Sequence, residues 1–433
     1  MNYNKKGNLM SFKQFNLHPQ IEVGIQSLGY KMPTPIQLQS IPAILKGRDV
    51  MGLAQTGTGK TAAFVLPIMQ RLLMSGPRKK TRALIVAPTR ELAEQIHESI
   101  YELGRATKLK SIAVYGGVNK NPQIQKLRSG VEIIVSCPGR LVDLLEQRAA
   151  DLSGIEVLVL DEADRMFDMG FLPDIRKITK QLPEKRQTLL FSATMPSDIR
   201  GLAREILHDP VTLRIGEDAP AATVSHALYP VEQHLKTTLL IKLLQQTNTD
   251  SVLVFTRTKH RTTKVARQMK TAGFAVTSLQ GNLSQNQRQT ALSGFRNGKY
   301  RIMIATDIAA RGIDVNSISH VVNYDMPNTI EDYTHRIGRT GRADKTGNAF
   351  SFVTPQERDM AGAIEHILGE QIEQRTLQDF DYTLPAPTGN EGFRRSMSSF
   401  TRRKPPEQFR SATPQKEPAS SRMVSRASGR RSR

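Results

Sequence analysis

The sequence predicts two tandem α/β domains, each built on a doubly wound parallel β-sheet, followed by a disordered basic tail. Short apolar runs alternate with longer helix-like segments in both halves of the chain. Continuous apolar runs of this kind are typical of parallel strands that are buried on both faces. They lie at residues 50–53, 83–87, 133–135, 157–160 and 188–191 in the first half, and at 251–256, 275–279, 301–305 and 321–323 in the second. Two blocks of similar size therefore favour two domains of the same class.

Composition narrows the classes of function. The chain has 433 residues, a formal net charge of +21 and a single cysteine, Cys137. The charge predicts a polyanionic partner, which on charge alone is a nucleic acid, a ribosome or an anionic membrane. One cysteine excludes an intrachain disulfide and fits a reducing compartment. The apolar runs are too short for a signal peptide or a membrane span, so we expect a cytoplasmic protein without a membrane partner.

A glycine-rich loop follows the first apolar run and precedes an apolar, helix-like segment. Gly57 and Gly59 allow a tight turn whose backbone N–H groups can bind phosphate oxygens. Lys60 is placed to reach the β- and γ-phosphates of a nucleotide, and the Thr61 hydroxyl to bind Mg²⁺. The loop departs from the common motif at its first position, where alanine replaces glycine. The predicted phosphate loop consists of Ala54, Gln55, Thr56, Gly57, Thr58, Gly59, Lys60 and Thr61.

Two carboxylates, Asp161 and Glu162, follow the apolar run at 157–160. Open α/β sheets bind their ligands at the carboxyl ends of the strands. We therefore expect Asp161 to hold Mg²⁺ through water and Glu162 to be the base that orients an attacking water. Together with the glycine-rich loop, the two acids predict a site that binds ATP with Mg²⁺ and hydrolyses it.

Residues 161–164 read DEAD, and the chain resembles a DEAD-box RNA helicase from Phe12 to Gln374. This resemblance implies two RecA-like domains, an ATP-binding domain over 12–210 and a helicase C-terminal domain over 224–376. A segment rich in Pro, Gly and small residues separates them, and we place the linker at 211–223. The wording of residues 165–171 and the short basic tail resemble the bacterial RhlE-like branch.

The same resemblance places the adenine base against a segment near the N-terminus. Phe12, Tyr30 and Gln37 match the residues with which the family reads adenine. A glutamine amide donates and accepts hydrogen bonds at once, which suits the Hoogsteen edge of adenine, while Tyr30 can stack on the base. In the second domain, Asp314 is expected to contact the ribose.

Loops that follow the apolar runs resemble the RNA-binding loops of the family. Their arginines supply charge for phosphates, and their glycines allow close approach of the RNA backbone. Cys137 stands where the family usually has threonine, and a thiol is a poorer hydrogen-bond partner, so Cys137→Thr is expected to tighten RNA binding. The residues implied to bind RNA are Arg90, Gly116, Gly117, Cys137, Arg140, Arg257, Gln280, Gly281 and Thr306.

Further motifs imply how ATP and RNA are coupled. Ser192 and Thr194, in a Ser-Ala-Thr segment, and His335 are expected to link the nucleotide site to the RNA site. The second half has no phosphate loop of its own and should contribute to the first site from outside. The resemblance gives Arg339 and Arg342 the role of arginine fingers, which stabilise charge on the transferring phosphoryl group.

Both ends of the chain lie outside the resemblance. Residues 1–9 show no apolar periodicity, so we expect either a start at Met10 or that residues 1–9 are disordered and dispensable, within a disordered N-terminus over 1–11. Residues 384–433 hold 12 Lys or Arg against three Glu, with nine Ser and six Pro. We expect a disordered tail that neutralises RNA phosphates and stacks its phenylalanines on bases, with a merely solubilising tail as the alternative.

These observations predict an ATP-dependent RNA helicase that binds the RNA backbone across two domains and locally remodels duplexes or ribonucleoproteins. Ribosomal precursors and RNA-decay complexes are the expected settings, and no feature indicates an oligomeric state. Two alternatives remain open. A DNA-directed or translocating helicase would share the nucleotide site, and ATPase assays with RNA and DNA separate it. An RNA chaperone acting through the tail would keep its activity in a Glu162→Gln variant.

Overall fold

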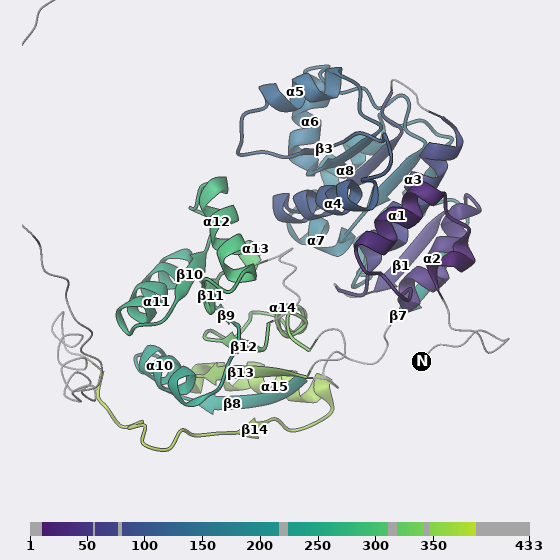
Figure 1. Ribbon diagram of the computed structural model, residues 1–433. Coiled ribbons are helices and arrows are strands. Elements are labelled where there is room, and N and C mark those ends of the chain that lie inside the picture. Colours follow the sequence, from purple (N-terminus) through teal and green to yellow (C-terminus); the bar gives the residue numbers. More distant parts are fainter. Residues whose placement is uncertain are drawn as a thin grey trace, which may run out of the picture. The chain divides into compact units, whose positions relative to one another are not determined.

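The computed structural model describes residues 11–54, 57–76, 80–215, 224–310, 318–341 and 346–386. They form two seven-stranded sheets in which every strand pairing is parallel (Figure 1). Helices connect successive strands, as parallel pairing requires. The predicted fold class of two doubly wound α/β domains is confirmed.

The first sheet is built from the apolar runs of the first half of the chain. Its central strands are buried on both faces, so that Val157 and Val159 pack into one core while Leu158 and Leu160 pack into the other. The strands lie in the order β3 (Ser111–Val114), β4 (Ile133–Ser136), β2 (Ala83–Val86), β5 (Val157–Leu160), β6 (Gln187–Ser192), β1 (Val50–Ala54) and β7 (Val211–Ile215).

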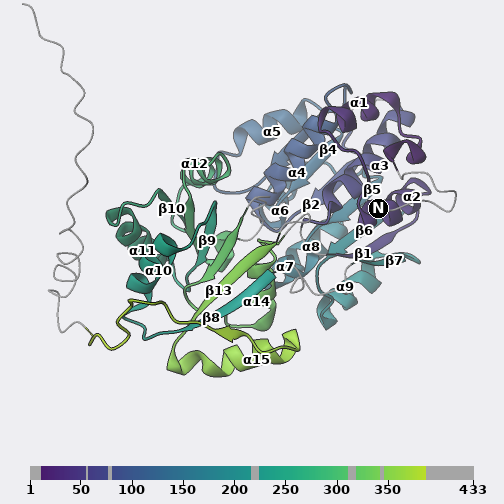
Figure 2. The same cartoon turned by 60° about the horizontal axis from the view of Figure 1, so that its bottom comes forward.

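Helices cover both faces of this sheet (Figure 2). One face carries η1 (Phe12–Phe15), α1 (Pro19–Ser27), α2 (Pro35–Leu45), α3 (Lys60–Met74) and α4 (Arg90–Leu103). The other carries α5 (Asn121–Arg128), α6 (Pro138–Glu146), α7 (Ala163–Asp168), α8 (Leu172–Thr179) and α9 (Ser197–Ile206). The carboxyl ends of the strands therefore open onto loops that lead directly into helix N-termini.

The second sheet repeats this arrangement. Its strands lie in the order β10 (Val276–Leu279), β11 (Ile302–Ala305), β9 (Val252–Phe255), β12 (His320–Asn323), β13 (Gly347–Val353), β8 (Val224–Pro230) and β14 (Glu373–Gln374). Helices α10 (Lys236–Gln246) and α11 (Lys259–Thr271) pack on one face. The other face carries α12 (Gln285–Arg296), α13 (Asp307–Ala310), α14 (Ile330–Ile337) and α15 (Arg358–Leu368), which η3 (Pro355–Glu357) precedes.

The two sheets share one strand order when β8 is matched with β1, β9 with β2, and so on to β14 with β7. The helix that follows β1 begins at the lysine of the glycine-rich loop, Lys60, whereas the helix that follows β8 begins at Lys236. The nucleotide loop thus belongs to the first sheet alone, in agreement with the sequence.

The structure moves two predicted domain boundaries. Residues 211–215 were expected to begin the linker, but they form β7, which pairs in register with β1. This edge strand is only half-buried and alternates with exposed Thr212 and Arg214, so it lacks the continuous apolar run that identifies a central strand. The second domain continues beyond residue 376, because Phe380 and Tyr382 pack against its core.

Several predicted segments lie outside the described residues. These are residues 1–10, the linker residues 216–223 and the tail from residue 387 onward. The first compact unit ends at Tyr382, close to the predicted start of the tail at 384. No helix within the described ranges combines the length and the apolar character that crossing a bilayer requires.

Arg82 carries a buried charge with many hydrogen bonds beside the first sheet. It provides a test of how α3 packs on that sheet. Its side chain is 1% exposed, and its guanidinium donates to Glu156, to Ser75 Oγ and to two backbone carbonyls at the end of α3. Removing one partner of such a pair leaves buried acceptors without a donor. We expect Arg82→Met to lower the free energy of unfolding of the first domain by about 3–5 kcal/mol.

Denaturant unfolding of the full chain, followed by circular dichroism, measures this loss. The matched control is Arg105→Met, which removes an exposed arginine from the end of α4. Equal unfolding midpoints for both variants would contradict the assignment of Arg82 as the residue that holds α3 to the sheet.

Candidate functional site

The glycine-rich loop joins β1 to α3. Gly57 and Gly59 have φ of +87° and +91°, a left-handed conformation that favours glycine. A Cβ on Gly59 would lie 2.5 Å from Gln37 Nε2, so this position also excludes a side chain sterically. Lys60 is buried, and its Nζ donates to the carbonyl of Ala54 at 2.9 Å. The lysine is thus held over its own loop, where that carbonyl takes the hydrogen bond a phosphate oxygen would accept.

Not every predicted loop residue can be placed. Thr61 lies in the first turn of α3 next to Lys60, as expected. Gln55 and Thr56 lie outside the described residues. Thr58 is described and has interactions within the protein.

The predicted adenine segment packs against the glycine-rich loop. Gln37 is buried, its Oε1 accepts from the N–H of Thr34 at 2.9 Å, and its Nε2 donates to the carbonyl of Gly59 at 3.0 Å. Each end of the amide is therefore held by one hydrogen bond within the protein, which orients it, and each end keeps the capacity for one further hydrogen bond to a base. Gln37 connects the predicted base site to the phosphate loop.

Of the two predicted aromatic residues, Tyr30 is the more exposed. Tyr30 is 41% exposed and Phe12 is 6% exposed. The two rings stack, with centroids 6.1 Å apart and an interplanar angle of 28°. Phe12 also packs edge-to-face on Phe15. Phe12 thus supports the Tyr30 ring from the hydrophobic core, and its predicted contact with the nucleotide stays a prediction.

The two acids after β5 are buried and differ in their electrostatics. Burial raises the pKa of Asp161 to about 6, although Lys60 works against this shift. Burial also acts to raise the pKa of Glu162, but Arg165, Lys60 and Arg339 together hold it below its ordinary value. The reason is local, since Arg165 Nη1 lies 2.6 Å from Glu162 Oε2 in a buried ion pair.

Glu162 also carries backbone strain. Its φ is +53°, in the left-handed region that residues other than glycine rarely occupy. Strain of this kind persists where the surrounding structure enforces it and is frequent at functional sites. Here it turns the chain sharply from β5 into α7, so that Asp161 and Glu162 both stay at the carboxyl end of the sheet.

The donor set near Lys60 fits Mg²⁺ bound mainly by nucleotide and water. Asp161 offers one carboxylate and Thr61 one hydroxyl, both hard oxygen donors. Mg²⁺ in nucleotide sites uses one or two carboxylates together with phosphate oxygens and water. The described residues contain no group of three or more His, Cys, Asp or Glu that forms a metal cage. The residues therefore fit an ion that arrives with its nucleotide.

Asp164, which the sequence left without a role, joins the strand ends of β5 and β6. Its Oδ2 accepts from the backbone N–H of Ala193 at 3.0 Å, from the N–H of Thr194 at 2.8 Å and from Thr194 Oγ1 at 3.1 Å. Its own N–H donates to Ser192 Oγ at 3.2 Å. The predicted coupling residues Ser192 and Thr194 are thus bound directly to the segment that holds Glu162.

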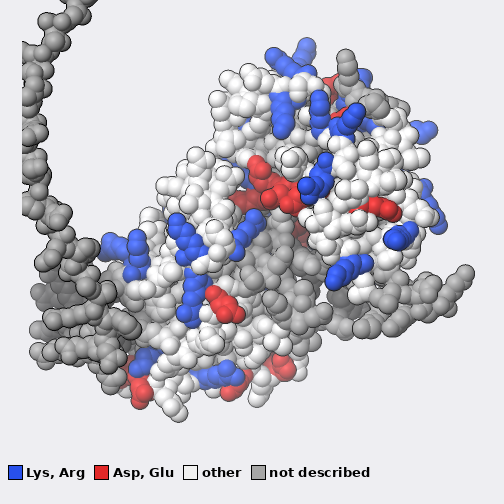
Figure 3. Space-filling view, viewed as in Figure 1, with Lys and Arg blue, Asp and Glu red and all other residues white. Residues whose placement is uncertain are grey.

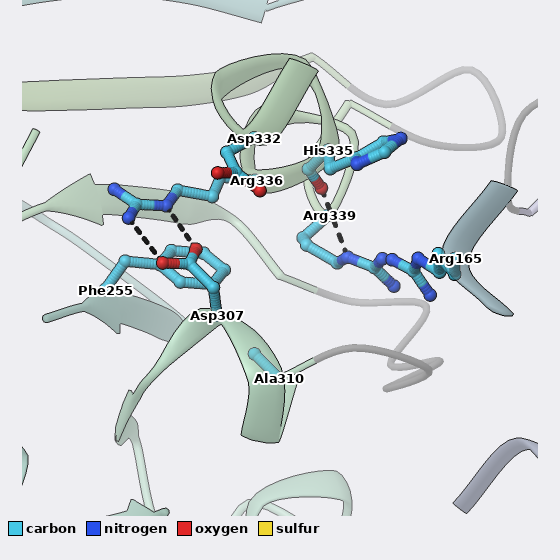
Figure 4. Close-up of a pocket in the computed structure, with 8 residues that line it drawn as sticks. All are labelled: Arg165, Phe255, Asp307, Ala310, Asp332, His335, Arg336 and Arg339. Carbon is cyan, nitrogen blue, oxygen red and sulfur yellow. Dashed lines mark hydrogen bonds and ion pairs between the residues drawn. The ribbon is translucent and has the colours of Figure 1, made fainter. Parts of the chain in front are cut away.

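Arg339 and His335 lie together at the end of α14, on a cavity of about 20 Å³ (Figure 4). Arg339 Nε donates to the carbonyl of His335 at 3.3 Å, and its guanidinium lies beside that of Arg165. Burial, Arg165 and Arg339 lower the pKa of His335, so the imidazole is neutral near pH 7. Two other predicted residues of this group, Arg342 and Asp314, lie outside the described residues.

A network of ion pairs and hydrogen bonds, which the sequence did not predict, holds the end of α14 in place. Arg336 makes a bidentate ion pair with Asp307, at 2.6 and 2.7 Å, which Figure 4 shows beside Arg339. It also donates to the carbonyl of Asp325 at 2.7 Å. The Asp325 carboxylate in turn accepts from the N–H of Arg257 at 2.8 Å and pairs with Arg261. The sequence shows the order of these residues but not their contacts, and Asp325 belongs to none of the motifs named above.

The first-domain residues implied to bind RNA lie together. Gly116 and Gly117 pack against Arg90, and a Cβ on Gly117, whose φ is +79°, would lie 2.0 Å from Arg90 Nη1. Arg140 donates to the carbonyl of Val118 at 3.1 Å, and its buried Nη1 has no hydrogen-bond partner within the described chain. Cys137 is the N-cap of the helix that carries Arg140. The glycines thus position two arginines rather than only allowing close approach of RNA.

The second-domain residues form a similar group at the ends of β9, β10 and β11. Arg257 is exposed and donates to Glu357 Oε1 at 3.1 Å. Gln280 accepts from the N–H of Asn282 at 2.7 Å, and Lys259 Nζ donates to the side chain of Asn282 at 3.1 Å. Gly281 has open space where a Cβ would be, and Thr306 leads into α13. The loop at 280–282 is thus tied to the start of α11.

Comparisons with known proteins match both halves of the chain. Residues 34–202 match the DEAD/DEAH box helicase family and residues 235–344 the helicase conserved C-terminal domain. The chain is 39% identical to the DEAD-box ATP-dependent RNA helicase CshA of Bacillus subtilis over 376 residues, which cover 87% of this chain and 76% of that protein. The chain belongs to the DEAD-box family of ATP-dependent RNA helicases.

Other DEAD-box proteins support the fold and the family, which the sequence had predicted. The ATP-dependent RNA helicase DeaD of Mycobacterium tuberculosis is 41% identical over 378 residues, which cover 87% of this chain and 66% of that protein. The structure of Saccharomyces cerevisiae Dbp5 bound to RNA and ADP BeF3 matches with a TM-score of 0.77 and 32% identity, and covers 84% of this chain and 95% of that one. Relatives compared by sequence from a bacterium, a yeast and a plant are 38%, 43% and 45% identical, so similarity alone does not assign the RhlE-like branch.

The environment of Cys137 predicts an unreactive thiol. The side chain is 8% exposed, and burial, with a smaller contribution from Glu91, raises the pKa of Cys137 to about 12. Because the thiolate is the nucleophile, alkylation at pH 8 should be slower in the folded protein than in the unfolded chain by roughly a hundredfold or more. Mass spectrometry after timed iodoacetamide treatment measures this rate.

Cys137 is the only cysteine of the chain, so every modified molecule reports on this position. Unfolded protein in denaturant gives the reference rate, and Cys137→Thr gives the background. Equal rates in folded and unfolded protein would show that the thiol is accessible. The expected gain in RNA affinity on Cys137→Thr stays a prediction.

The hydrogen bonds of Asp164 predict that its removal uncouples ATP from RNA. In Asp164→Asn the Ser-Ala-Thr segment loses its charged acceptor, and an amide oxygen in the place of Oδ2 would turn the amide NH2 toward the N–H of Arg165, which now donates to Oδ1. We expect RNA stimulation of ATPase to fall on the order of tenfold, a typical size for coupling between sites, while ATP affinity without RNA stays unchanged. The measurement is the ratio of ATPase rates with and without saturating RNA, with exposed Asp151→Asn as control. A normal ratio in Asp164→Asn would contradict the role.

Proposed function

We propose that this DEAD-box protein binds ATP at the glycine-rich loop of the first sheet, hydrolyses it with Glu162, and uses the cycle to remodel RNA. The observation that carries this proposal is one continuous set of contacts. Lys60 lies over the phosphate loop, buried Asp161 and Glu162 follow at the end of β5, and Asp164 binds the Ser-Ala-Thr segment. A change at the nucleotide therefore has a direct path to the neighbouring strand end.

Glu162 acts as an ionised carboxylate in this scheme. Its pKa lies below the ordinary value, so it is charged near pH 7 and can accept a hydrogen bond from a water that attacks the γ-phosphate. Its ion pair with Arg165 occupies Oε2 and leaves the other oxygen for water. Lys60 supplies positive charge to the phosphates, and Arg339 supplies more from the second domain. Bound Mg²⁺, held by Thr61 and Asp161, would neutralise phosphate charge.

RNA is proposed to bind the two groups of strand-end loops through its backbone. Arginines and close-packed glycines recognise phosphate and sugar rather than base edges. Low sequence specificity follows, together with a preference for RNA over DNA wherever the 2′-OH is contacted. The structure of Dbp5 with RNA and ADP BeF3 supports this proposal, because the structural match extends over most of this chain and most of Dbp5.

The cellular setting is proposed from the composition of the chain and its family. A high positive charge, one cysteine and the family favour a cytoplasmic enzyme that acts on ribosomal precursors or in RNA decay. Membership of the RhlE-like branch stays a prediction that rests on residues 165–171 and the short basic tail. Of the alternatives, the DNA-directed helicase predicts equal stimulation by DNA and RNA, and the tail-based chaperone predicts RNA remodelling without ATP.

A Glu162→Gln variant tests the proposed chemistry. The amide keeps the size of the side chain but loses the charge that orients water, so ATPase should fall by roughly 10²- to 10⁴-fold. Binding of a fluorescent ATP analogue should remain close to wild type, because the glycine-rich loop is unchanged. Steady-state ATPase with RNA and with DNA of the same sequence, alongside an RNA duplex-unwinding assay, gives the readout.

The control is Glu184→Gln, which removes an exposed carboxylate from the turn before β6. Its ATPase should equal that of wild type. Wild-type-like turnover in Glu162→Gln would refute the assignment of Glu162, and unwinding without ATPase would favour the chaperone alternative.

A further inference from the structure

Helix α11 is a basic helix that no motif explains. Its 13 residues, Lys259–Thr271, contain five Lys or Arg and no Asp or Glu. Only Thr262, Val265 and Met269 are buried, and they fix the helix on the core of the second sheet. The remaining surface of the helix therefore carries positive charge.

Three of these cations form a stripe on the solvent side. Lys264, Arg267 and Lys270 are exposed and follow one another at intervals of three residues. At this spacing side chains share a helix face, roughly 4.5 Å apart along the axis. Figure 3 shows Lys and Arg side chains on the part of the surface that α11 forms. We name Lys264, Arg267 and Lys270 the α11 stripe.

The α11 stripe differs from its neighbours because its charge is not neutralised. Arg261, on the same helix, pairs with Asp325 at 2.5 Å, and Arg257 pairs with Glu357 at 3.1 Å. In the part of the chain that the structure describes, the stripe side chains make no hydrogen bond and no ion pair. A surface that only needs to be soluble does not require three unpaired cations in a row with no acidic residue on the helix.

The N-terminus of α11 lies beside the proposed RNA loops. The helix begins two residues after Arg257, and its first residue, Lys259, donates to Asn282, which follows Gln280 and Gly281. The hydroxyl of Thr258 caps the first turn by accepting from the N–H of Arg261 at 3.2 Å. The α11 stripe therefore continues a surface on which RNA is already proposed to lie, and leads away from the strand ends.

We propose that the α11 stripe is a second RNA contact, which binds phosphates of the flanking RNA that leaves the Arg257 and Gln280 loops. The proposal rests on the RNA-binding role of those loops. Lysine and arginine side chains on one helix face recognise phosphate charge without reading bases. The stripe lengthens the footprint on RNA, and it adds affinity only for strands longer than the minimal site.

The experiment compares two triple variants of the full-length protein. The test variant is Lys264→Gln, Arg267→Gln and Lys270→Gln. The control variant is Lys108→Gln, Lys110→Gln and Lys185→Gln, three exposed lysines that precede β3 and β6, at the ends of the strands opposite the proposed sites. Both variants lose three positive charges. Fluorescence anisotropy measures binding of a minimal single-stranded RNA and of the same RNA extended at both ends, over a series of salt concentrations.

We expect the test variant to bind the extended RNA more weakly on the order of tenfold at low salt. The slope of log affinity against log salt should fall by roughly 2, since each lost phosphate contact removes about 0.7. Binding of the minimal RNA and RNA-independent ATPase should match wild type, which also shows that the variant is folded. The control variant should behave as wild type with both RNAs.

Equal salt slopes for the test variant and wild type would overturn the proposal, and so would an equal loss in the control variant, which would show a general effect of net charge. The failure of the proposed function looks different, because wild-type protein itself would then fail to bind the minimal RNA. A loss confined to the extended RNA in the test variant supports the α11 stripe.

Discussion

The carboxylate of Asp164 holds together the carboxyl ends of β5 and β6, where ATP hydrolysis is proposed. Three hydrogen bonds from Ala193 and Thr194 end on one oxygen, and charge-assisted bonds of this kind are stronger than neutral ones. Because the same short segment bears Asp161 and Glu162, the strand ends of β5 and β6 behave as one unit. A movement of Glu162, the proposed water-orienting acid, would then be transmitted to the Ser-Ala-Thr segment.

The second domain contains a comparable buried ionic network, in which the central group is a guanidinium and not a carboxylate. The Arg336 guanidinium binds Asp307 and the backbone of Asp325, and the Asp325 carboxylate reaches the backbone of Arg257. Arg336 is buried, and its charge is matched by a bidentate partner. The helix that presents Arg339 and the loop that presents Arg257 therefore share one support. In each domain, a single buried ionic group thus joins a residue proposed to act on the nucleotide to a segment proposed to bind RNA or to couple to it.

The fold could be predicted from the sequence where strands are buried on both faces. The site could be predicted where its residues lie close together in the sequence. Runs such as residues 157–160 predict a parallel strand, because a strand that is buried on both faces needs an apolar side chain at every position. The half-buried edge strand β7 has no such constraint, and it was assigned to the linker. Likewise, the spacing of Lys60 from Gly57 and Gly59 is a local signal, whereas the ion pair of Glu162 with Arg165 and the internal bonds of Gln37 exist only in three dimensions.

The shared strand order of the two sheets allows Lys236 of the second domain to be compared with Lys60 of the first. Lys236 begins the helix after β8, the position that Lys60 holds after β1, and it is completely buried. Its ammonium lies 2.9 Å from Glu357 and 3.9 Å from Asp325, so carboxylates of the protein itself serve as its anions. The Lys236 ammonium is therefore neutralised inside the protein and is not offered to an external phosphate. Rebuilding a nucleotide site in this domain would require the removal of both acids and not merely the insertion of glycines.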